Sequence, residues 1–217
     1  MSNEDFLNKG KRRGSSYRRT KTLNDLSTVY SQGLNTSRRS SSEQFSSSEF
    51  AQSNQSTFQR KLFKGQGMYE GNFFLGLRSG KGTLKSLDGR RVIYDGNWKN
   101  DKPDGFGTNI LVNGDQYHGN YTNGLRDGWG MYSYHYGDKY VGNWSEGFMN
   151  GKGKFTWSTG DWYEGTLCKG SITGSGCKHQ IDGSIVHGSF VDGQADGYCS
   201  KEYLCGDSFE GDYSLDM

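Results

Sequence analysis

The chain contains glycine pairs of a type that can bind phosphate. Gly-x-Gly recurs at Gly80/Gly82, Gly105/Gly107, Gly128/Gly130, Gly151/Gly153 and Gly174/Gly176. A phosphate loop needs a helix N-terminus behind it or a Gly-Lys-Ser/Thr ending, and neither follows any of these pairs. We therefore predict no phosphate or other cofactor site.

Acidic residues also recur in register, at the edges where predicted strands meet turns: Glu70, Asp95, Asp104, Asp127 and Glu164. Two neighbouring carboxylates can serve as acid and base in catalysis. A catalytic residue is needed once, however, and these residues recur from repeat to repeat, which is typical of solvated loops. The sequence predicts no catalytic residue, and we expect the chain not to be an enzyme.

Four cysteines lie near His179 and His187 in the last third of the chain, at Cys168, Cys177, Cys199 and Cys205. Their spacing of 9, 22 and 6 residues includes no Cys-x-x-Cys and differs from that of a zinc ribbon. We expect free thiols and no metal site. Free thiols favour a reducing, cytoplasmic compartment.

A repeat supplies the elements that would position all these residues. An aromatic or apolar residue followed by x-Gly opens seven copies, at Tyr69, Tyr94, Tyr117, Tyr140, Tyr163, Val186 and Phe209. The first two copies are 25 residues apart and the later ones 23. Self-similarity at a fixed period of this size indicates a repeat array.

Within one copy, aromatic residues and glycines alternate, which is strand spacing. In the copy from Tyr140, one face of the first strand would carry Tyr140, Gly142 and Trp144, and the second strand would show Gly151, Gly153, Phe155 and Trp157 on one face. A glycine leaves a gap in the pleated surface that a ring on the neighbouring strand can cover. The expected role of glycine here is therefore packing.

The strands are expected to be closed by two-residue x-Gly hairpin loops in which both residues have positive φ. These loops would be Asp88-Gly89, Asn113-Gly114, Tyr136-Gly137, Thr159-Gly160, Asp182-Gly183 and Cys205-Gly206. The other connections, such as residues 99–104 with Pro103, are expected to be longer and polar. The pattern predicts an all-β fold, an elongated single-layer antiparallel β-meander with two strands per repeat.

The recurring pattern of Tyr-x-Gly-x-aromatic, a polar stretch, Gly-x-Gly, two aromatic residues and an x-Gly turn resembles the MORN repeat (membrane occupation and recognition nexus). The resemblance covers residues 69–217, as about six repeats and a partial last one. Two copies depart from it: the copy from Tyr163 has Leu167 in the Trp place, and the copy from Val186 has Cys199 in place of its second glycine. The resemblance implies scaffolding at cytoskeletal and membrane-associated structures, including cilia, flagella and the cell cortex.

Composition divides the chain near residue 65. Residues 1–65 contain 14 Ser and 4 Gly, with 12 Lys and Arg against 5 Asp and Glu. Residues 66–217, the expected repeat array, contain 30 Gly, with 14 Lys and Arg against 19 Asp and Glu. Because residues 1–65 have no sustained hydrophobic period, we expect a disordered basic arm.

The basic arm has two Arg-Arg-x-Ser sequences, which end at Ser15 and Ser41 and are predicted phosphorylation sites. A phosphate there would offset the attraction of the arm to an anionic membrane. One alternative function is therefore a peripheral membrane module that binds anionic lipid through the arm. No stretch of the sequence is apolar enough to predict a transmembrane span.

Aromatic residues form columns across the predicted strands, and a single-layer sheet has no second layer to cover them. We predict that this face binds a partner helix or peptide through Phe73, Trp98, Tyr121, Trp144, Tyr134 and Trp157. The alternative is that these rings are only the array's own core. Because the array is acidic, it would repel nucleic acid, and we expect none as a partner.

The favoured function is a non-catalytic scaffold that binds a protein segment. A further alternative is that the repeats are the targeting part of a longer enzyme, because proteins that the array resembles carry phosphoinositide kinase or SET methyltransferase domains after their repeats. An open meander also has edge strands that can pair with another copy, so a homodimer is a further expectation, with residues 209–213 the more exposed edge.

Overall fold

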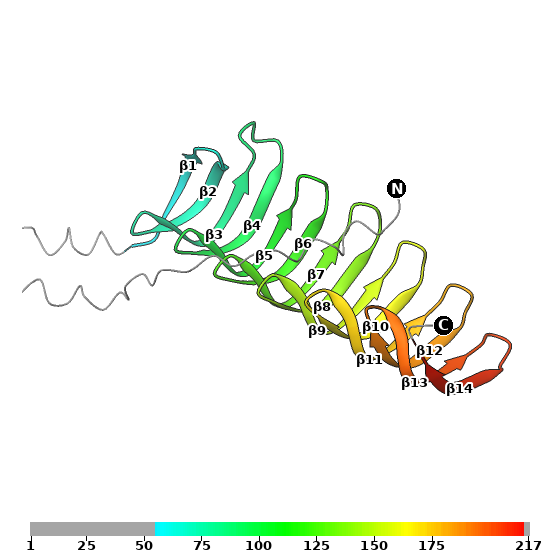
Figure 1. Ribbon diagram of the computed structural model, residues 1–217. Helices are drawn as coiled ribbons and strands as arrows, with labels where there is room; N and C mark the ends of the chain where they lie inside the picture. The colour runs from blue at the N-terminus through cyan, green and yellow to red at the C-terminus, as the bar shows by residue number, and fades with distance from the viewer. Residues whose placement is uncertain (1–54, 215–217) are drawn as a thin grey trace, which may run out of the picture. The chain divides into compact units, whose positions relative to one another are not determined.

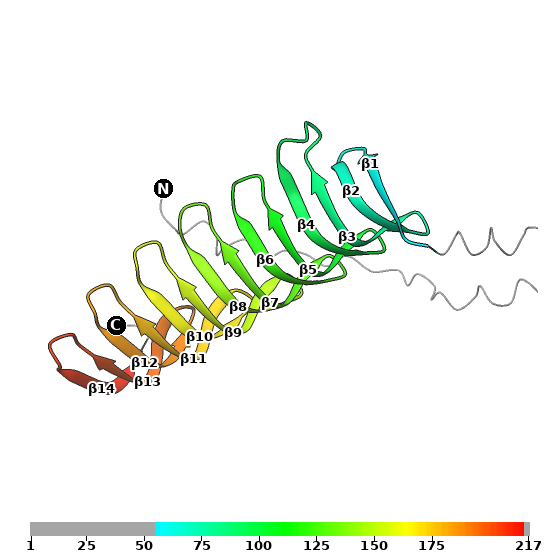
Figure 2. The ribbon, with the colours of Figure 1, turned by 180° about the vertical axis from the view of Figure 1, so that it is seen from behind.

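The computed structural model describes residues 55–214, and these residues form one open sheet of 14 strands in chain order. Every neighbouring pair is antiparallel, so the predicted single-layer meander is confirmed, and the described residues contain no helix. Figure 1 and Figure 2 show the strands in one row, with a set of turns along each long edge. The strands are β1 (Thr57–Phe63), β2 (Gly67–Phe74), β3 (Leu77–Lys85), β4 (Val92–Lys99), β5 (Lys102–Ile110), β6 (Gln116–Thr122), β7 (Leu125–Ser133), β8 (Lys139–Ser145), β9 (Phe148–Thr156), β10 (Trp162–Cys168), β11 (Ser171–His179), β12 (Ile185–Val191), β13 (Gln194–Glu202) and β14 (Ser208–Tyr213).

The first strand corrects the predicted boundary at residue 65. β1 lies inside the stretch expected to be a disordered arm, and it pairs with β2 along its whole length. Six of its seven residues are exposed and only Phe63 packs against the core, so backbone pairing holds the strand more than side-chain burial does. Its sequence carries neither the tyrosine nor the glycines of the repeat. Residues 1–54, with Ser15, Ser41 and most of the basic arm, lie outside the described residues.

The tight two-residue turns lie at the opposite ends of the strands from those predicted. Lys99 pairs directly with Lys102, so residues 99–104 contain a two-residue turn and Pro103 belongs to β5. In this set of turns both central residues have positive φ, as type I′ hairpins require: Leu75-Gly76, Asn100-Asp101, Asn123-Gly124, Glu146-Gly147, Lys169-Gly170 and Asp192-Gly193.

The x-Gly dipeptides that were predicted as type I′ turns are part of wider turns. The Gly114 amide donates to the Leu111 carbonyl at 3.2 Å, and the Leu111 amide donates to the Asp115 carbonyl at 2.9 Å. Only Gly114 of the turn has positive φ. This is the arrangement of a type I turn followed by a left-handed glycine. It joins each second strand to the next repeat except after β3, where the turn is longer and the Ser86 amide donates to the Arg91 carbonyl.

The two glycines of each Gly-x-Gly have different roles, which corrects the prediction that both serve packing. Between β8 and β9 the register shifts after Gly142, and Gly151 lies in the resulting bulge with a φ of 99°. Gly153, two residues later, pairs with Gly142 and lies under the ring of Tyr140. The first glycine therefore bends the strand, and the second makes room for a ring.

The core lies on the face of the sheet that carries Tyr69, Tyr94, Tyr117, Tyr140 and Tyr163, which we call the tyrosine face. These side chains are at most 2% exposed. Each hydroxyl donates to the backbone carbonyl three residues further on, at 2.9–3.1 Å. The glycines thus let each ring lie flat on the backbone, and each phenol keeps a hydrogen bond.

The sixth repeat solves the same packing problem differently. Val186 replaces the tyrosine, and Cys199 replaces the second glycine. The Cys199 side chain is 1% exposed. Its Sγ lies so close to Gly188 that a Cβ added to this glycine would be only 2.3 Å from the sulfur. The sulfur therefore fills the space that a tyrosine ring fills in the other repeats, so the two departures from the repeat compensate each other.

Candidate functional site

The second aromatic residues of the first strands belong to the core. Phe73, Trp98, Tyr121 and Trp144 are 3–8% exposed. They alternate with the tyrosines in edge-to-face contacts, with Tyr94 5.0 Å from Trp98 and 5.4 Å from Tyr121 between ring centroids. Such contacts stabilise aromatic pairs beyond the area they bury. Four of the six residues that were predicted to contact a partner are thus packed mainly against other residues of the array.

Tyr134 and Trp157, the other two predicted contacts, are partly buried. They belong to a row on the second strands, in which Tyr132 lies 4.6 Å from Tyr134 and Phe155 lies 4.9 Å from Trp157. No finding tests whether any of the six rings touches a partner, so that role stays a prediction.

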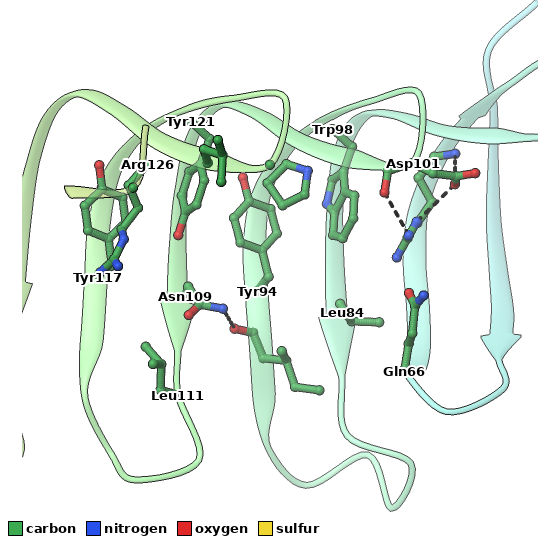
Figure 3. Close-up of a pocket in the computed structure, with 16 residues that line it drawn as sticks. Gln66, Leu84, Tyr94, Trp98, Asp101, Asn109, Leu111, Tyr117, Tyr121 and Arg126 are labelled. Carbon is green, nitrogen blue, oxygen red and sulfur yellow. Dashed lines mark hydrogen bonds and ion pairs between the residues drawn. The ribbon is translucent and has the colours of Figure 1, made fainter. Parts of the chain in front are cut away.

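A groove of about 610 Å³ opens on the tyrosine face over the first repeats. Figure 3 shows Tyr94, Trp98, Tyr117 and Tyr121 side by side along it, with Leu84 and Leu111 nearer the wide turns. Of the six predicted contact residues, only Trp98 and Tyr121 line this groove. Phe73, Trp144, Tyr134 and Trp157 do not.

The groove exists because its second strands lack the aromatic row. The places held by Tyr132 and Tyr134 in the third repeat and by Phe155 and Trp157 in the fourth are held by Asn109 and Leu111 in the second. In the first repeat, Leu84 takes the place of Tyr132. Smaller side chains leave a hollow where rings would otherwise stand. Sequence reasoning missed this, although the missing rings are visible once the repeats are aligned.

Arg78, from β3, lies at the end of the groove nearest the first repeat, and it is 5% exposed. Its Nε donates to Asp101 Oδ1 at 3.1 Å, and its Nη2 donates to the Asp101 carbonyl at 2.8 Å. Its guanidinium also lies 4.3 Å from the centre of the Trp98 ring. Its Nη1 has no hydrogen-bond partner among residues 55–214. A buried N–H without an acceptor is costly, so this atom is suited to an acceptor supplied by a bound segment.

Arg126 occupies the matching place two repeats later, but no acid stands where Asp101 stands beside Arg78. At the first site, the Asp101 amide donates to the Arg78 carbonyl. At the second site, the Gly147 amide donates to the Arg126 carbonyl, so a residue without a side chain takes the place of Asp101. The Arg126 guanidinium lies 4.4 Å from the centre of the Trp144 ring and 5.2 Å from that of Tyr132. In the described part of the chain no carboxylate pairs with it. The groove thus presents a cation held by aromatic rings.

Asp115 lies in the wide turn that begins at Leu111, one of the residues that line the groove. It is 5% exposed and accepts from the Tyr132 hydroxyl at 2.8 Å and from the His135 backbone amide and ring Nδ1 at 2.9 Å. Burial alone would raise the pKa of Asp115, but the hydrogen bonds from His135, Tyr132 and Asn113 together hold it well below its usual range.

Replacing Asp115 with alanine is expected to lower the free energy of unfolding by about 2–3 kcal/mol, because it leaves the Tyr132 hydroxyl and the His135 amide without their acceptor. Asp138, one repeat on, accepts from the Ser158 amide. Asp138→Ala is the matched control and should cost less. Chemical denaturation measures both.

Because the folded pKa of Asp115 is lowered, the contribution of this carboxylate to the free energy of unfolding is present above about pH 4 and is lost as the pH falls. Equal costs for the two variants would contradict this role for Asp115.

The residues that were considered for metal binding do not share one site, since Cys199 lies in the core of the tyrosine face and Cys168 and Cys205 are exposed. The four cysteines are free thiols, and the Cys177 Sγ lies 4.0 Å from His187 Nε2. Within residues 55–214 no three His, Cys, Asp or Glu side chains gather as a metal site would require. Burial raises the pKa of the Cys177 thiol. In the same range of residues, no helix is long and apolar enough to cross a membrane.

The geometry defines the class: a single-sheet protein of stacked two-stranded repeats, with an aromatic core on one face and a groove in it. Four of the repeats are MORN repeats, since the family model for the MORN repeat matches residues 69–89, 94–116, 140–162 and 187–203. The hairpins from Tyr117 and Tyr163, outside those matches, have the same bulged register.

A comparison with curated protein sequences gives no match. One solved structure that matches the chain is the TCP domain of SAS-4 from Drosophila melanogaster, in complex with a proline-rich motif of Ana2. The two share 10% sequence identity at a TM-score of 0.38, over 84% of this chain and 99% of that one. At this TM-score the likeness gives no information about function.

Proposed function

We propose that the MORN array is a non-catalytic interaction module that binds a segment of a partner protein in the groove on the tyrosine face. The observation that carries this proposal is the groove itself, where the aromatic row of the third and fourth repeats is absent and a hollow of about 610 Å³ remains. A hollow floored by rings and rimmed by a few polar groups is typical of a binding site.

The groove also specifies the chemistry of the segment. Apolar side chains would contact Leu84, Ile93 and Leu111, which line the wide-turn side. A carboxylate would pair with Arg126, and a neutral carbonyl would accept from Nη1 of Arg78, because Asp101 already neutralises that guanidinium. The partner is therefore a protein segment with apolar residues and at least one acidic residue.

Capture of a partner from cell extract by the full chain tests this function. Arg126→Glu reverses the unpaired charge, and Leu111→Asp puts a carboxylate on the apolar side of the groove. Each is expected to reduce capture at least about tenfold, as the loss of one central contact does. The matched control is Phe106→Asp in β5, because Phe106 is 40% exposed and does not line the groove.

Circular dichroism must first show that all three variants keep the sheet. Capture that survives Arg126→Glu and Leu111→Asp but is lost in Phe106→Asp would place the interaction on the other face. Loss in both groove variants with retention in the control supports the groove.

A further inference from the structure

The first strand of the sheet is half of a repeat. Gln59 faces Gly71 across β1 and β2, just as Gly82 faces Gly96 across β3 and β4. β1 therefore stands in the place of a second strand, and among the described residues no first strand lies beside it.

The last strand is the other half. Gly211 faces Cys199 across β14 and β13, in the register that places Gly96 opposite Gly82. β14 therefore stands in the place of a first strand, and within residues 55–214 no second strand follows it. The two outer strands are complementary halves of one repeat.

The charges of these two strands are also complementary. β1 and the residue after it carry Arg60, Lys61 and Lys64, and residues 55–64 contain no acid. The turn before β14 and the strand itself carry Asp207, Glu210 and Asp212, and residues 202–214 contain no Lys or Arg. Opposite charges across a strand pair are attractive, and like charges are repulsive.

We propose that β14 of one copy of this chain pairs with β1 of a second copy, so that copies join head to tail through one continued sheet. In the register of the repeats, Gly211 faces Gln59 of the next copy, Glu210 faces Arg60, and Phe209 faces Lys61. Pairing of β14 with β14, or of β1 with β1, would set like charges against each other. This contact therefore joins unlike edges.

Among residues 55–214, no strand pairs with the outer side of β1 or of β14. Neither the β1–β2 pair nor the β13–β14 pair contains a register shift, and the two edge strands contain no proline. Phe58, Leu62 and Phe209 are 50–69% exposed on these strands, and the contact would cover them. A regular, unprotected edge strand is a template for another strand.

The contact between copies is weaker than a hairpin inside the array. Gln59 stands at the place of the second glycine, so the ring of Phe209 cannot lie flat there as the tyrosines do. The contact therefore forms reversibly. It uses two different surfaces, so each added copy leaves a free edge at both ends until a ring closes, and growth continues past a dimer.

Sedimentation velocity of the full chain over a wide range of concentrations is the first test. The weight-average mass should rise with concentration past that of a dimer and fall as salt is added. A monomer at every concentration, as expected if residues outside the described range cover an edge, overturns the proposal. A dimer that grows no further overturns it too.

Charge reversal then identifies the edges. Arg60→Glu and Glu210→Arg should each weaken association about tenfold, because an attractive cross-strand pair becomes repulsive. The double variant Arg60→Glu/Glu210→Arg should recover it. Lys139→Glu and Glu146→Arg change the net charge equally at exposed places inside the array, and they should leave association unchanged. Single variants that associate normally, or a folded double variant as weak as the singles, would refute the contact.

Discussion

Replacing Gly153 with cysteine is expected to lower the free energy of unfolding by about 2–3 kcal/mol, as overpacking of a well-packed core does. A Cβ at this position would lie 2.4 Å from the Tyr140 hydroxyl and 2.5–2.6 Å from its ring. The ring cannot rise without losing its hydrogen bond to the Asn143 carbonyl and its contact with Trp144. Chemical or thermal denaturation followed by circular dichroism measures the loss.

The informative variant is the double one. Tyr140→Val alone removes a fully buried ring and should cost at least about 3 kcal/mol. Tyr140→Val together with Gly153→Cys reproduces the pair that the chain already uses at Val186 and Cys199. The new sulfur fills the space of the lost ring, so the double variant should be more stable than the sum of the two losses predicts, by at least about 1 kcal/mol.

Lys152→Cys, next to Gly153 but exposed, controls for the added thiol and should cost little. If the losses from Tyr140→Val and Gly153→Cys simply add, the ring and the glycine are not a packing unit. Because repeat arrays can unfold in parts, coincident transitions by two probes should precede any comparison of free energies.

The period and the strands could be predicted from the sequence because an aromatic or apolar residue alternates with glycine in every copy. The turns could not, because x-Gly occurs at both ends of the strands. Asn113-Gly114 and Asn123-Gly124 have the same letters, yet only Asn123 has positive φ. The two turns differ in the number of residues between the last paired residues of their two strands. The register of the strand pair sets that number.

The groove escaped prediction for a related reason. The sequence shows which positions carry rings, and the rings of the first strands lie buried against each other. The hollow lies where the second strands of the first repeats carry Leu84, Asn109 and Leu111. The absence of a ring is a weaker signal than its presence, and it acquires meaning only after the repeats are placed side by side in space.

The strand β1 could not be predicted from amino-acid composition. Its residues resemble those of the arm before it, with Arg60 and Lys61 in the middle of the strand, and almost none of them is buried. An edge strand draws its stability from the backbone of its neighbour, which leaves little trace in the side chains. The boundary of the array was therefore placed too late.

Raising the pH is expected to unfold the array between about pH 10 and 12. Burial raises the pKa of Tyr69, Tyr117, Tyr134 and Tyr140 to about 12, and it raises those of Tyr94, Tyr121 and Tyr132 as well. A phenol in the unfolded chain ionises near pH 10. The stabilisation from these groups is thus fully present below pH 10 and is lost as the pH rises towards 12.

Absorbance of the phenolate and circular dichroism, recorded on the same samples, check this expectation. The buried tyrosines should ionise together with the loss of the sheet signal, because a ring held flat over glycine cannot be charged in place. Tyr140→Phe is the sharpest comparison. It should cost about 1 kcal/mol at neutral pH through its lost hydrogen bond. At pH 11.5 its disadvantage should shrink or reverse, because the variant has one fewer phenol to ionise. Phenolate formation near pH 10 with the sheet intact would mean that water reaches the rings, and the tyrosine face would then be an open surface rather than a core.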